Sequence, residues 1–199
     1  MKNKTKIADA TYIDDISGLK LDTSKLYTMN EIYLYEAKNI TKATLKYLSA
    51  VPDKKLAPFS YDWFMTLHKD MFGDVWEWAG KLRHVELSIG VKAYLVGTEI
   101  KKLVDDLAFW HEYKSFETIE IASRLHHRAV QIHPFFNGNG RWSRMLANIY
   151  LKQNGLQPTR WNENLLSKEN RHRDRYIKAL KMADSGDYSE LIRLQGNII

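Results

Sequence analysis

The stretch from His133 to Arg144 carries the side chains whose types and spacing could do chemistry. It reads His-Pro-Phe-Phe-Asn-Gly-Asn-Gly-Arg-Trp-Ser-Arg. One imidazole, a base whose ordinary pKa lies near neutrality, stands beside a glycine-rich turn and two arginines three residues apart. These are the groups needed to hold a polyphosphate and to activate a hydroxyl that attacks it. The packing of a hydrophobic core requires no such arrangement.

The backbone expected around this stretch would direct its polar groups toward an anion. Pro134 ends the preceding helix directly after the histidine, which leaves the imidazole at a helix end. Gly138 and Gly140 allow the backbone to approach a ligand closely. A new helix then begins, so its unpaired N–H groups and its dipole would face the anion. Arg141 and Arg144, at positions i and i+3, share one face of its first turns.

The same stretch resembles the signature of the Fic family, His-x-Phe-x-(Asp/Glu)-Gly-Asn-Gly-Arg-x-x-Arg, except at the acidic position. For Gly-Asn-Gly alone a plain loop is the better interpretation, whereas the twelve residues together favour a functional site. The similarity covers about residues 60–195, and its glycines favour the Fic branch over the related Doc toxins. Outside the signature it includes Leu67-His68, Phe72, Trp76, Trp78-Ala79-Gly80, Arg83, Tyr176, Ala179-Leu180 and Gly186-Asp187.

The resemblance implies a protein adenylyltransferase, a nucleotidyltransferase that moves AMP from ATP to a Ser, Thr or Tyr hydroxyl of a target protein. His133 would be the general base that takes the hydroxyl proton. Pyrophosphate would leave, and catalysis would come from positioning and charge neutralisation. Phe135 would be a buried anchor for the loop, which is also the role that simple core packing would give it.

The resemblance also implies where the phosphates of ATP bind. Gly138, Asn139 and Gly140 would form the nest for the α- and β-phosphates. Arg141 would contact the β-phosphate and Arg144 the γ-phosphate.

Asn137 stands where family members usually carry the Asp or Glu that holds Mg²⁺. An amide oxygen coordinates without charge, so we expect weaker Mg²⁺ binding. Three outcomes stay open: a slower adenylyltransferase that relies on the phosphates for its metal, a Fic-type enzyme with altered phosphotransfer chemistry, or a catalytically weak nucleotide-binding regulatory module. The first is favoured because His133 and both arginines remain.

The segment 82–96 carries the only strand pattern in the chain, since apolar and polar residues alternate there around a central glycine. It predicts a short β-hairpin. By resemblance, 86–96 would be the flap that clamps an extended target segment by adding it as a strand. The alternative is a hairpin that merely covers the core, and only its position beside the motif favours a flap. The expected target-binding residues are Leu87, Ser88, Ile89, Gly90 and Val91.

Many family members are silenced by a helix bearing Ser/Thr-x-x-x-Glu-Gly/Asn, whose glutamate pairs with the second arginine of the signature. The string from Thr159 to Asn164 fits, with Glu163 as the glutamate. It follows the motif helix, where we expect a loop, so chance is the favoured explanation. Glu36, on a long N-terminal helix, is better placed in chain order but lacks the flanking residues. An inhibitory Glu36 is therefore a hypothesis.

The helical period dominates the rest of the chain and predicts a mainly α, compact Fic-like domain with one hairpin. We expect a wrapping segment and a long helix in 1–55, packed on a catalytic core in 56–199 as one globular unit. The expected helices are 29–50, capped at Thr28 or Asn30, and 60–72, 98–113, 118–133, 140–154, 167–185 and 189–194.

Composition bounds the remaining possibilities. The chain has 199 residues, 44% of them hydrophobic, which is enough for one domain with a core. It has no cysteine, so disulfides and thiolate metal sites are excluded. His126, His127 and His133 are not interpreted as metal ligands, because no carboxylate is spaced to complete a metal site with them.

The net charge of +6 permits nucleotides, RNA or an acidic protein as partners. A basic nucleic-acid-binding helical domain is the least supported alternative. No apolar run resembles a signal peptide or a membrane span, so we expect a cytoplasmic protein or a delivered, toxin-like effector. The expected partners are ATP and a target protein, with an antitoxin or other inhibitory partner as a further candidate.

Overall fold

The computed structural model describes residues 18–22, 27–166 and 169–196. It is mainly helical, as predicted. Residues 1–17 and 23–26, which hold most of the expected N-terminal wrapping segment, lie outside the described residues. In chain order the helices are α1 (Met29–Leu48), α2 (Tyr61–Phe72), the 3₁₀ helix η1 (Ala93–Leu95), α3 (Val96–Glu112), α4 (Thr118–Ile132), α5 (Asn139–Gln153), α6 (Glu163–Leu166), α7 (Arg171–Asp184) and α8 (Ser189–Gln195).

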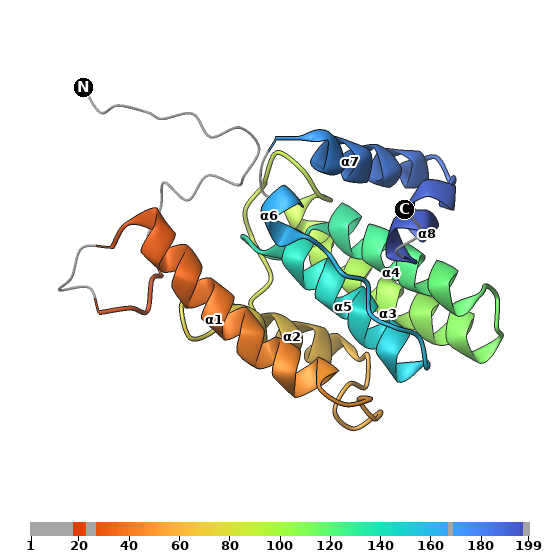
Figure 1. The fold of residues 1–199 in the computed structure, drawn as a ribbon, viewed down its shortest axis with the longest axis horizontal. Helices are drawn as coiled ribbons and strands as arrows, with labels where there is room; N and C mark the ends of the chain where they lie inside the picture. Colours follow the sequence, from red (N-terminus) through yellow and green to blue (C-terminus); the bar gives the residue numbers. More distant parts are fainter. Residues whose placement is uncertain (1–17, 23–26, 167–168, 197–199) are drawn as a thin grey trace.

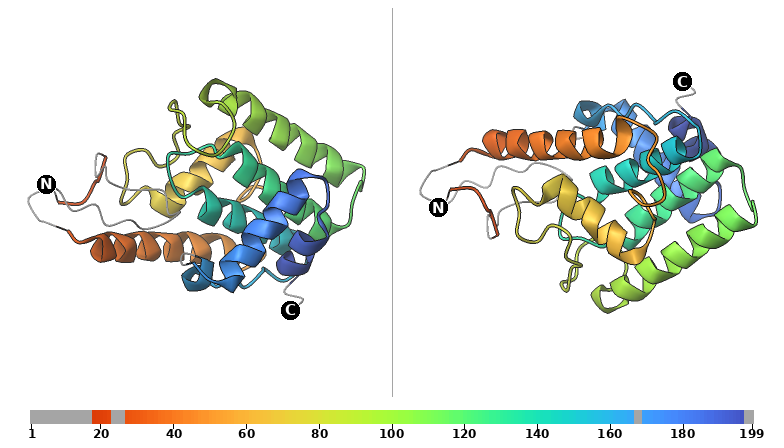
Figure 2. Two further views of the ribbon diagram at one scale, coloured as in Figure 1. Left: turned by 90° about the horizontal axis from the view of Figure 1, so that it is seen from above. Right: turned by 90° about the horizontal axis from the view of Figure 1, so that it is seen from below.

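The helices α4 and α5 form the centre of the molecule (Figure 1). The helix α3 packs on α4, while α1 and α2 pack on each other and on α5. On the opposite side, α8 packs on α4 and α7 on α8 (Figure 2). The buried residues of α5 include Trp142, Leu146 and Ile149, and those of α2 include Phe64 and Leu67. The loop between α4 and α5, which carries the motif, is therefore held on both sides by packed helices.

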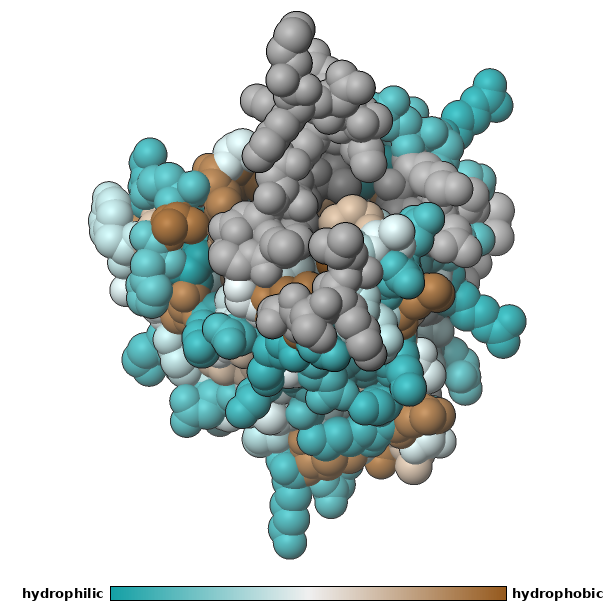
Figure 3. Space-filling model, turned by 90° about the vertical axis from the view of Figure 1, so that its left-hand side faces the viewer, coloured by the Kyte–Doolittle hydropathy of each residue, from teal (hydrophilic) through white to brown (hydrophobic). Residues whose placement is uncertain are grey.

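Hydrophilic side chains cover most of the face seen in Figure 3 outside its grey atoms, and hydrophobic residues form separate groups there. Exposed apolar residues of α1 include Leu34 and Leu45. None of the helices in the described ranges is long and apolar enough to cross a membrane.

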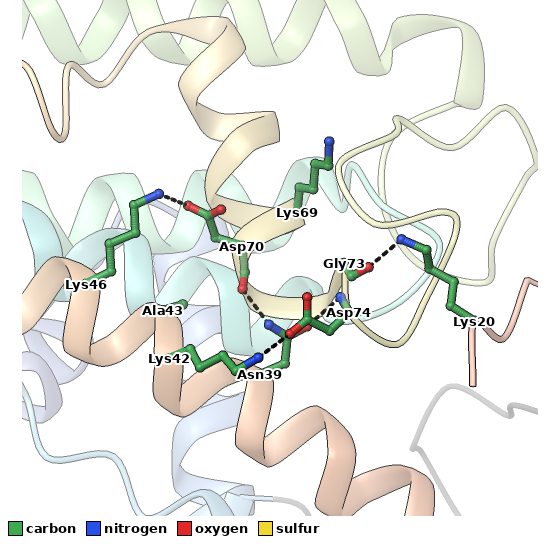
Figure 4. Close-up of a pocket in the computed structure, with 9 residues that line it drawn as sticks. All are labelled: Lys20, Asn39, Lys42, Ala43, Lys46, Lys69, Asp70, Gly73 and Asp74. Atoms are coloured by element: carbon green, nitrogen blue, oxygen red, sulfur yellow. Dashed lines mark hydrogen bonds and ion pairs between the residues drawn. The ribbon is translucent and has the colours of Figure 1, made fainter. Parts of the chain in front are cut away.

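Polar contacts fix α1 against the C-terminal end of α2. The Asn39 amide donates to the backbone oxygen of Asp70 at 2.9 Å and accepts from the backbone N–H of Asp74 at 2.8 Å. Lys42 pairs with the Asp74 carboxylate and Lys46 with that of Asp70, around a polar pocket (Figure 4). Because Asn39 is buried, its two hydrogen bonds fix the rotation of α1 about its own axis. They thereby also fix the direction in which the neighbouring turns of α1 point their side chains.

The predicted β-hairpin is wrong. Residues 81–92 form an irregular loop, and the described residues contain a single isolated β-bridge, between Leu19 and Trp76. The Arg83 side chain donates hydrogen bonds to the carbonyl oxygens of Val85 and Val91, which in a hairpin would accept from the backbone of the opposite strand. The backbone N–H groups of Arg83 and Val91 instead donate to the carbonyl oxygens of Pro134 and Ile132, where α4 ends. The alternating pattern misled because long-range contacts, not cross-strand pairs, satisfy this backbone.

Candidate active site

The motif loop is closed by one side chain at its end. The helix α4 stops at His133, which adopts a left-handed conformation with φ of +53°, and Gly138 precedes α5 with φ of +78°. The Asn139 amide accepts from the backbone N–H of Phe135 and donates to its carbonyl oxygen, both at 2.8 Å. The Asn139 side chain is therefore used within the loop. Its predicted role in phosphate binding could only be played by the backbone N–H.

His68, on α2, packs against the motif loop and forms a hydrogen bond with it. Its ring stacks on Phe135 with centroids 3.6 Å apart. Its Nδ1 accepts from the backbone N–H of Gly80, so Nε2 carries the proton and donates to the carbonyl oxygen of Asn137 at 3.1 Å. Burial lowers the pKa of His68 to about 3, so the ring stays neutral. Sequence reasoning gave His68 no such role.

The loop approaches α2 closely at its glycine. A Cβ on Gly138 would lie 2.7 Å from the ring of Phe72. The positive φ and this contact together explain why a residue without a side chain is needed here. Phe135 is fully buried, at the position where an anchor was expected.

His133 is buried but stands at the edge of the loop. Only 7% of its surface is exposed. Burial lowers its pKa to about 4, the backbone of Val130 acts in the opposite direction, and the charge of Arg83 adds to the lowering. The imidazole is therefore neutral at pH 7, which is the form that accepts a proton. Its Nδ1 makes no hydrogen bond within the described residues.

The first arginine of the motif is paired with the N-terminal helix. Arg141 donates from Nη1 to Glu36 Oε2 at 2.6 Å, and its guanidinium lies over the ring of Phe72. Glu36 is fully buried, and its other oxygen accepts from Trp76 Nε1 at 2.6 Å. Glu36 thus contacts the motif, as its inhibitory hypothesis requires, but at the first arginine rather than the second.

The second arginine is paired with Glu163, at the start of α6. Arg144 donates from Nε to Oε1 at 2.9 Å and from Nη2 to Oε2, so the contact is bidentate. The side chain of Arg144 is 8% exposed and that of Glu163 50%. The expected loop is instead a short helix, and the string from Thr159 to Asn164 does place its glutamate on the second arginine. Its fit to the inhibitory pattern was the available signal, and the explanation by chance missed this contact.

The residues around Asn137 do not fit a Mg²⁺ ion held by the protein. The Asn137 amide oxygen already accepts from the backbone N–H of Gly138 at 2.7 Å. The two carboxylates that contact the motif arginines, Glu36 and Glu163, are engaged in ion pairs with them. No group of three metal-ligating His, Cys, Asp or Glu side chains occurs in the ranges that the structure covers. A single neutral oxygen lacks the charge with which protein carboxylates bind this ion.

The expected target-binding residues lie beside His133 in the irregular loop. The backbone N–H of Val91 donates to the carbonyl oxygen of Ile132, the last residue of α4, at 3.3 Å. A Cβ on Gly90 would lie 2.7 Å from the Cβ of His133. Leu87 is half-buried, whereas Ser88 and Ile89 are exposed. The loop thus has the expected position without the expected strands.

Known proteins resemble this chain in sequence. The model of the Fic/DOC family matches residues 58–151. "Protein adenylyltransferase Fic" from Aedes aegypti is 27% identical over 155 residues, which are 76% of this chain and 30% of that protein. "Protein adenylyltransferase fic-1" from Caenorhabditis elegans is 27% identical over 183 residues, 89% of this chain and 33% of that protein. The chain therefore spans about a third of the length of these relatives.

Solved structures share its fold. A fragment of Fic-1 from C. elegans superposes with a TM-score of 0.69 at 22% identity, over 92% of this chain and 56% of that one. The effector BepC from Bartonella tribocorum, solved with bound AMPPNP, gives a TM-score of 0.63 at 17% identity, over 88% of this chain and 90% of that one. The fold and the family match agree, and residues 58–151 of this chain match the Fic/DOC family.

Proposed function

We propose that this chain is a protein adenylyltransferase that moves AMP from ATP to a Ser, Thr or Tyr hydroxyl of a target protein. The observation that carries the proposal is the geometry of the motif. A neutral His133 ends α4 beside the N-terminus of α5, whose first turns carry Arg141 and Arg144. The names of the sequence relatives and the AMPPNP bound to BepC support nucleotide chemistry in this fold.

In the proposed reaction, the target hydroxyl gives its proton to His133, and its oxygen attacks the α-phosphorus of ATP. The bond from that phosphorus to the bridging oxygen of the β-phosphate breaks, and pyrophosphate leaves with the bonding electrons. Backbone N–H groups at the start of α5 and the guanidiniums of Arg141 and Arg144 would stabilise the phosphate charge. His133 then releases the proton to solvent. We derive no step through Mg²⁺, because the side chains at this site do not fit it.

Arg141 and Arg144, the two arginines proposed to bind phosphate, are each already paired with a glutamate carboxylate. The phosphates of ATP would have to displace one or both of these carboxylates. Glu163 is half exposed, and water can solvate its carboxylate when it leaves Arg144. Glu36 is fully buried and also bonded to Trp76, so its displacement from Arg141 requires movement of buried groups. We therefore propose that both glutamates restrain nucleotide binding, with Glu163 as the easier one to displace.

Residues 87–91, within the loop 85–91, would contact the target, as their place beside His133 suggests. Since the loop contains no strand, the target would bind to its exposed backbone and side chains rather than to a preformed hairpin. The unit proposed to act is the core 56–199 with α1 packed upon it, because α1 supplies Glu36.

A nucleotide-binding regulatory module is the second candidate. Two features favour it: Asn137 carries no charge to hold a metal ion, and both motif arginines are already paired with glutamates. Both features would slow catalysis without affecting the fold. ATP labelled separately at its α- and γ-phosphates separates these functions, in a lysate supplied as a source of targets. Label entering protein from the α position supports the transferase. Label from γ alone indicates a kinase reaction, and ATP binding without any transfer indicates the module.

A further inference from the structure

Arg83 connects the catalytic histidine to both ends of the loop 85–91. Its Nε donates to the carbonyl oxygen of His133 at 2.7 Å, and its Nη1 to that of Val85 at 2.9 Å. Its Nη2 donates to the carbonyl oxygens of Val91 and, at 3.5 Å, Ile132. One side chain, 4% exposed, thus contacts four backbone carbonyls from two segments distant in sequence.

This use of an arginine is unusual because, within the described residues, no carboxylate forms an ion pair with it. Burial lowers the pKa of Arg83, and the charge of Glu86, which does not contact it, acts in the opposite direction. A buried guanidinium is ordinarily paired with an acid, since an unpaired buried charge is costly. Among the residues that the structure describes, Arg83 has no ion-pair partner within 4.0 Å, and the carbonyl oxygens take that place. All three of its nitrogens are used, so the position requires the planar fork of an arginine and not only a positive charge.

The hydrogen bond from Arg83 reaches a residue, His133, whose backbone conformation is strained. A left-handed conformation outside glycine costs about 1–2 kcal/mol, so neighbouring contacts must hold it. The Arg83 side chain bonds the carbonyl of His133, and the Arg83 backbone N–H donates to that of Pro134 at 2.9 Å. These two bonds fix the peptide plane on each side of the turn. The direction of the imidazole therefore depends on Arg83.

The opposite side of the same guanidinium fixes the loop. The Val85 and Val91 carbonyls meet on it, and Gly90 between them approaches both His133 and Arg83. A Cβ on Gly90 would lie 2.8 Å from Arg83 Nη2. Movement of the loop would break bonds to the group that also holds His133.

We propose that Arg83 is a positioning residue that couples the target-binding loop 85–91 to the orientation of His133. A target that orders the loop would thereby also order the base, so that transfer is favoured when a target is bound. This inference rests on the proposed function, because it assigns the loop to the target and the base role to His133. Arg83 itself touches neither the target nor the nucleotide.

The test compares Arg83→Met and Arg83→Lys with a matched control, Arg128→Lys. Arg128, on α4, is also a bonded arginine, but its partners are the side chains of Glu99 on α3 and Gln131 rather than the loop 85–91 or His133. In Arg83→Met we expect kcat to fall roughly 10- to 100-fold, as for a small misplacement of a catalytic group, and KM for the target to rise. The Kd for ATP should stay within about twofold of wild type, because the phosphate site is formed by α5. Arg83→Lys should be intermediate, and Arg128→Lys near wild type.

Two kinetic results would overturn the proposal. One is full activity in Arg83→Lys, since a single ammonium cannot replace three guanidinium nitrogens. The other is a loss in Arg83→Met that lies entirely in the Kd for ATP.

A second measurement does not need activity. In NMR spectra at fixed pH, Arg83→Met should shift the imidazole resonances of His133 and speed hydrogen exchange at the Val91 amide. Exchange at the amide of Trp142, which lies on α5 and bonds to the carbonyl oxygen of Gly138 at the start of that helix, should stay unchanged. An unmoved His133 resonance with a freed loop would show that the two are not coupled. If the wild-type protein transfers no AMP, the proposed function fails, and this NMR result still decides whether the coupling exists.

Discussion

Replacement of Glu163 by glutamine should increase the affinity for ATP. The substitution keeps the shape of the side chain but removes the charge that pairs with Arg144. In the wild type, the γ-phosphate of ATP must displace a bidentate carboxylate whose side chain is 50% exposed. An ion pair with one half-exposed partner contributes about 1 kcal/mol, the upper end for solvent-accessible pairs. Its removal should therefore lower the Kd for ATP about fivefold.

Titration calorimetry measures this change directly, with Glu190→Gln as the matched control. Glu190 also pairs with arginines, Arg175 and Arg193, but on α7 and α8. The difference between wild type and Glu163→Gln should shrink at high salt, because salt screens the half-exposed pair. Equal or weaker ATP binding by Glu163→Gln would refute the reasoning, since Glu163 would then not compete with phosphate for Arg144.

Three further outcomes are expected. Glu36→Gln, which can still accept from Trp76, should raise the rate of AMP transfer, and an unchanged rate would remove Glu36 as an inhibitor. His68 and His126 have pKa values lowered to about 3 by burial, so the unfolded state binds more protons below pH 6.5. Stability should be full above that pH and fall toward pH 3 by about 1.4 kcal/mol per unit for each histidine, whereas urea midpoints unchanged from pH 7 to 4.5 would contradict this. Asn137→Asp should make transfer faster at limiting Mg²⁺, and no gain would count against the charge explanation.

The sequence predicted the parts of this molecule that depend on local patterns. The start of α5 followed from Gly138, and the end of α4 from Pro134, because backbone conformation is decided within a few residues. The capped start of α1 followed in the same way from Thr28, which forms a capping box with Glu31.

The parts that failed depend on contacts between distant segments. The alternation in 82–96 could not reveal that Arg83 would bind the carbonyls of a hairpin and join them to α4. Glu163 matched a pattern, yet only the path of the chain after α5 brings it back to Arg144. The pattern also gave no role to the Asn139 side chain, whose amide closes the loop on Phe135, while the predicted phosphate nest of Gly138, Asn139 and Gly140 stays a prediction. Spacing indicates which groups are available, whereas the fold decides which of them are already bonded.

The transfer of label from the α-phosphate of ATP to protein at pH 7.5 tests the central claim most directly. The assay compares wild type, His133→Ala and His172→Ala, the last as a control at an exposed histidine of α7. The proposed function predicts labelled protein with wild type and His172→Ala, and loss of the label in His133→Ala with ATP binding retained. Undiminished labelling by His133→Ala would contradict it, because the base assigned to the motif would then play no part in the reaction.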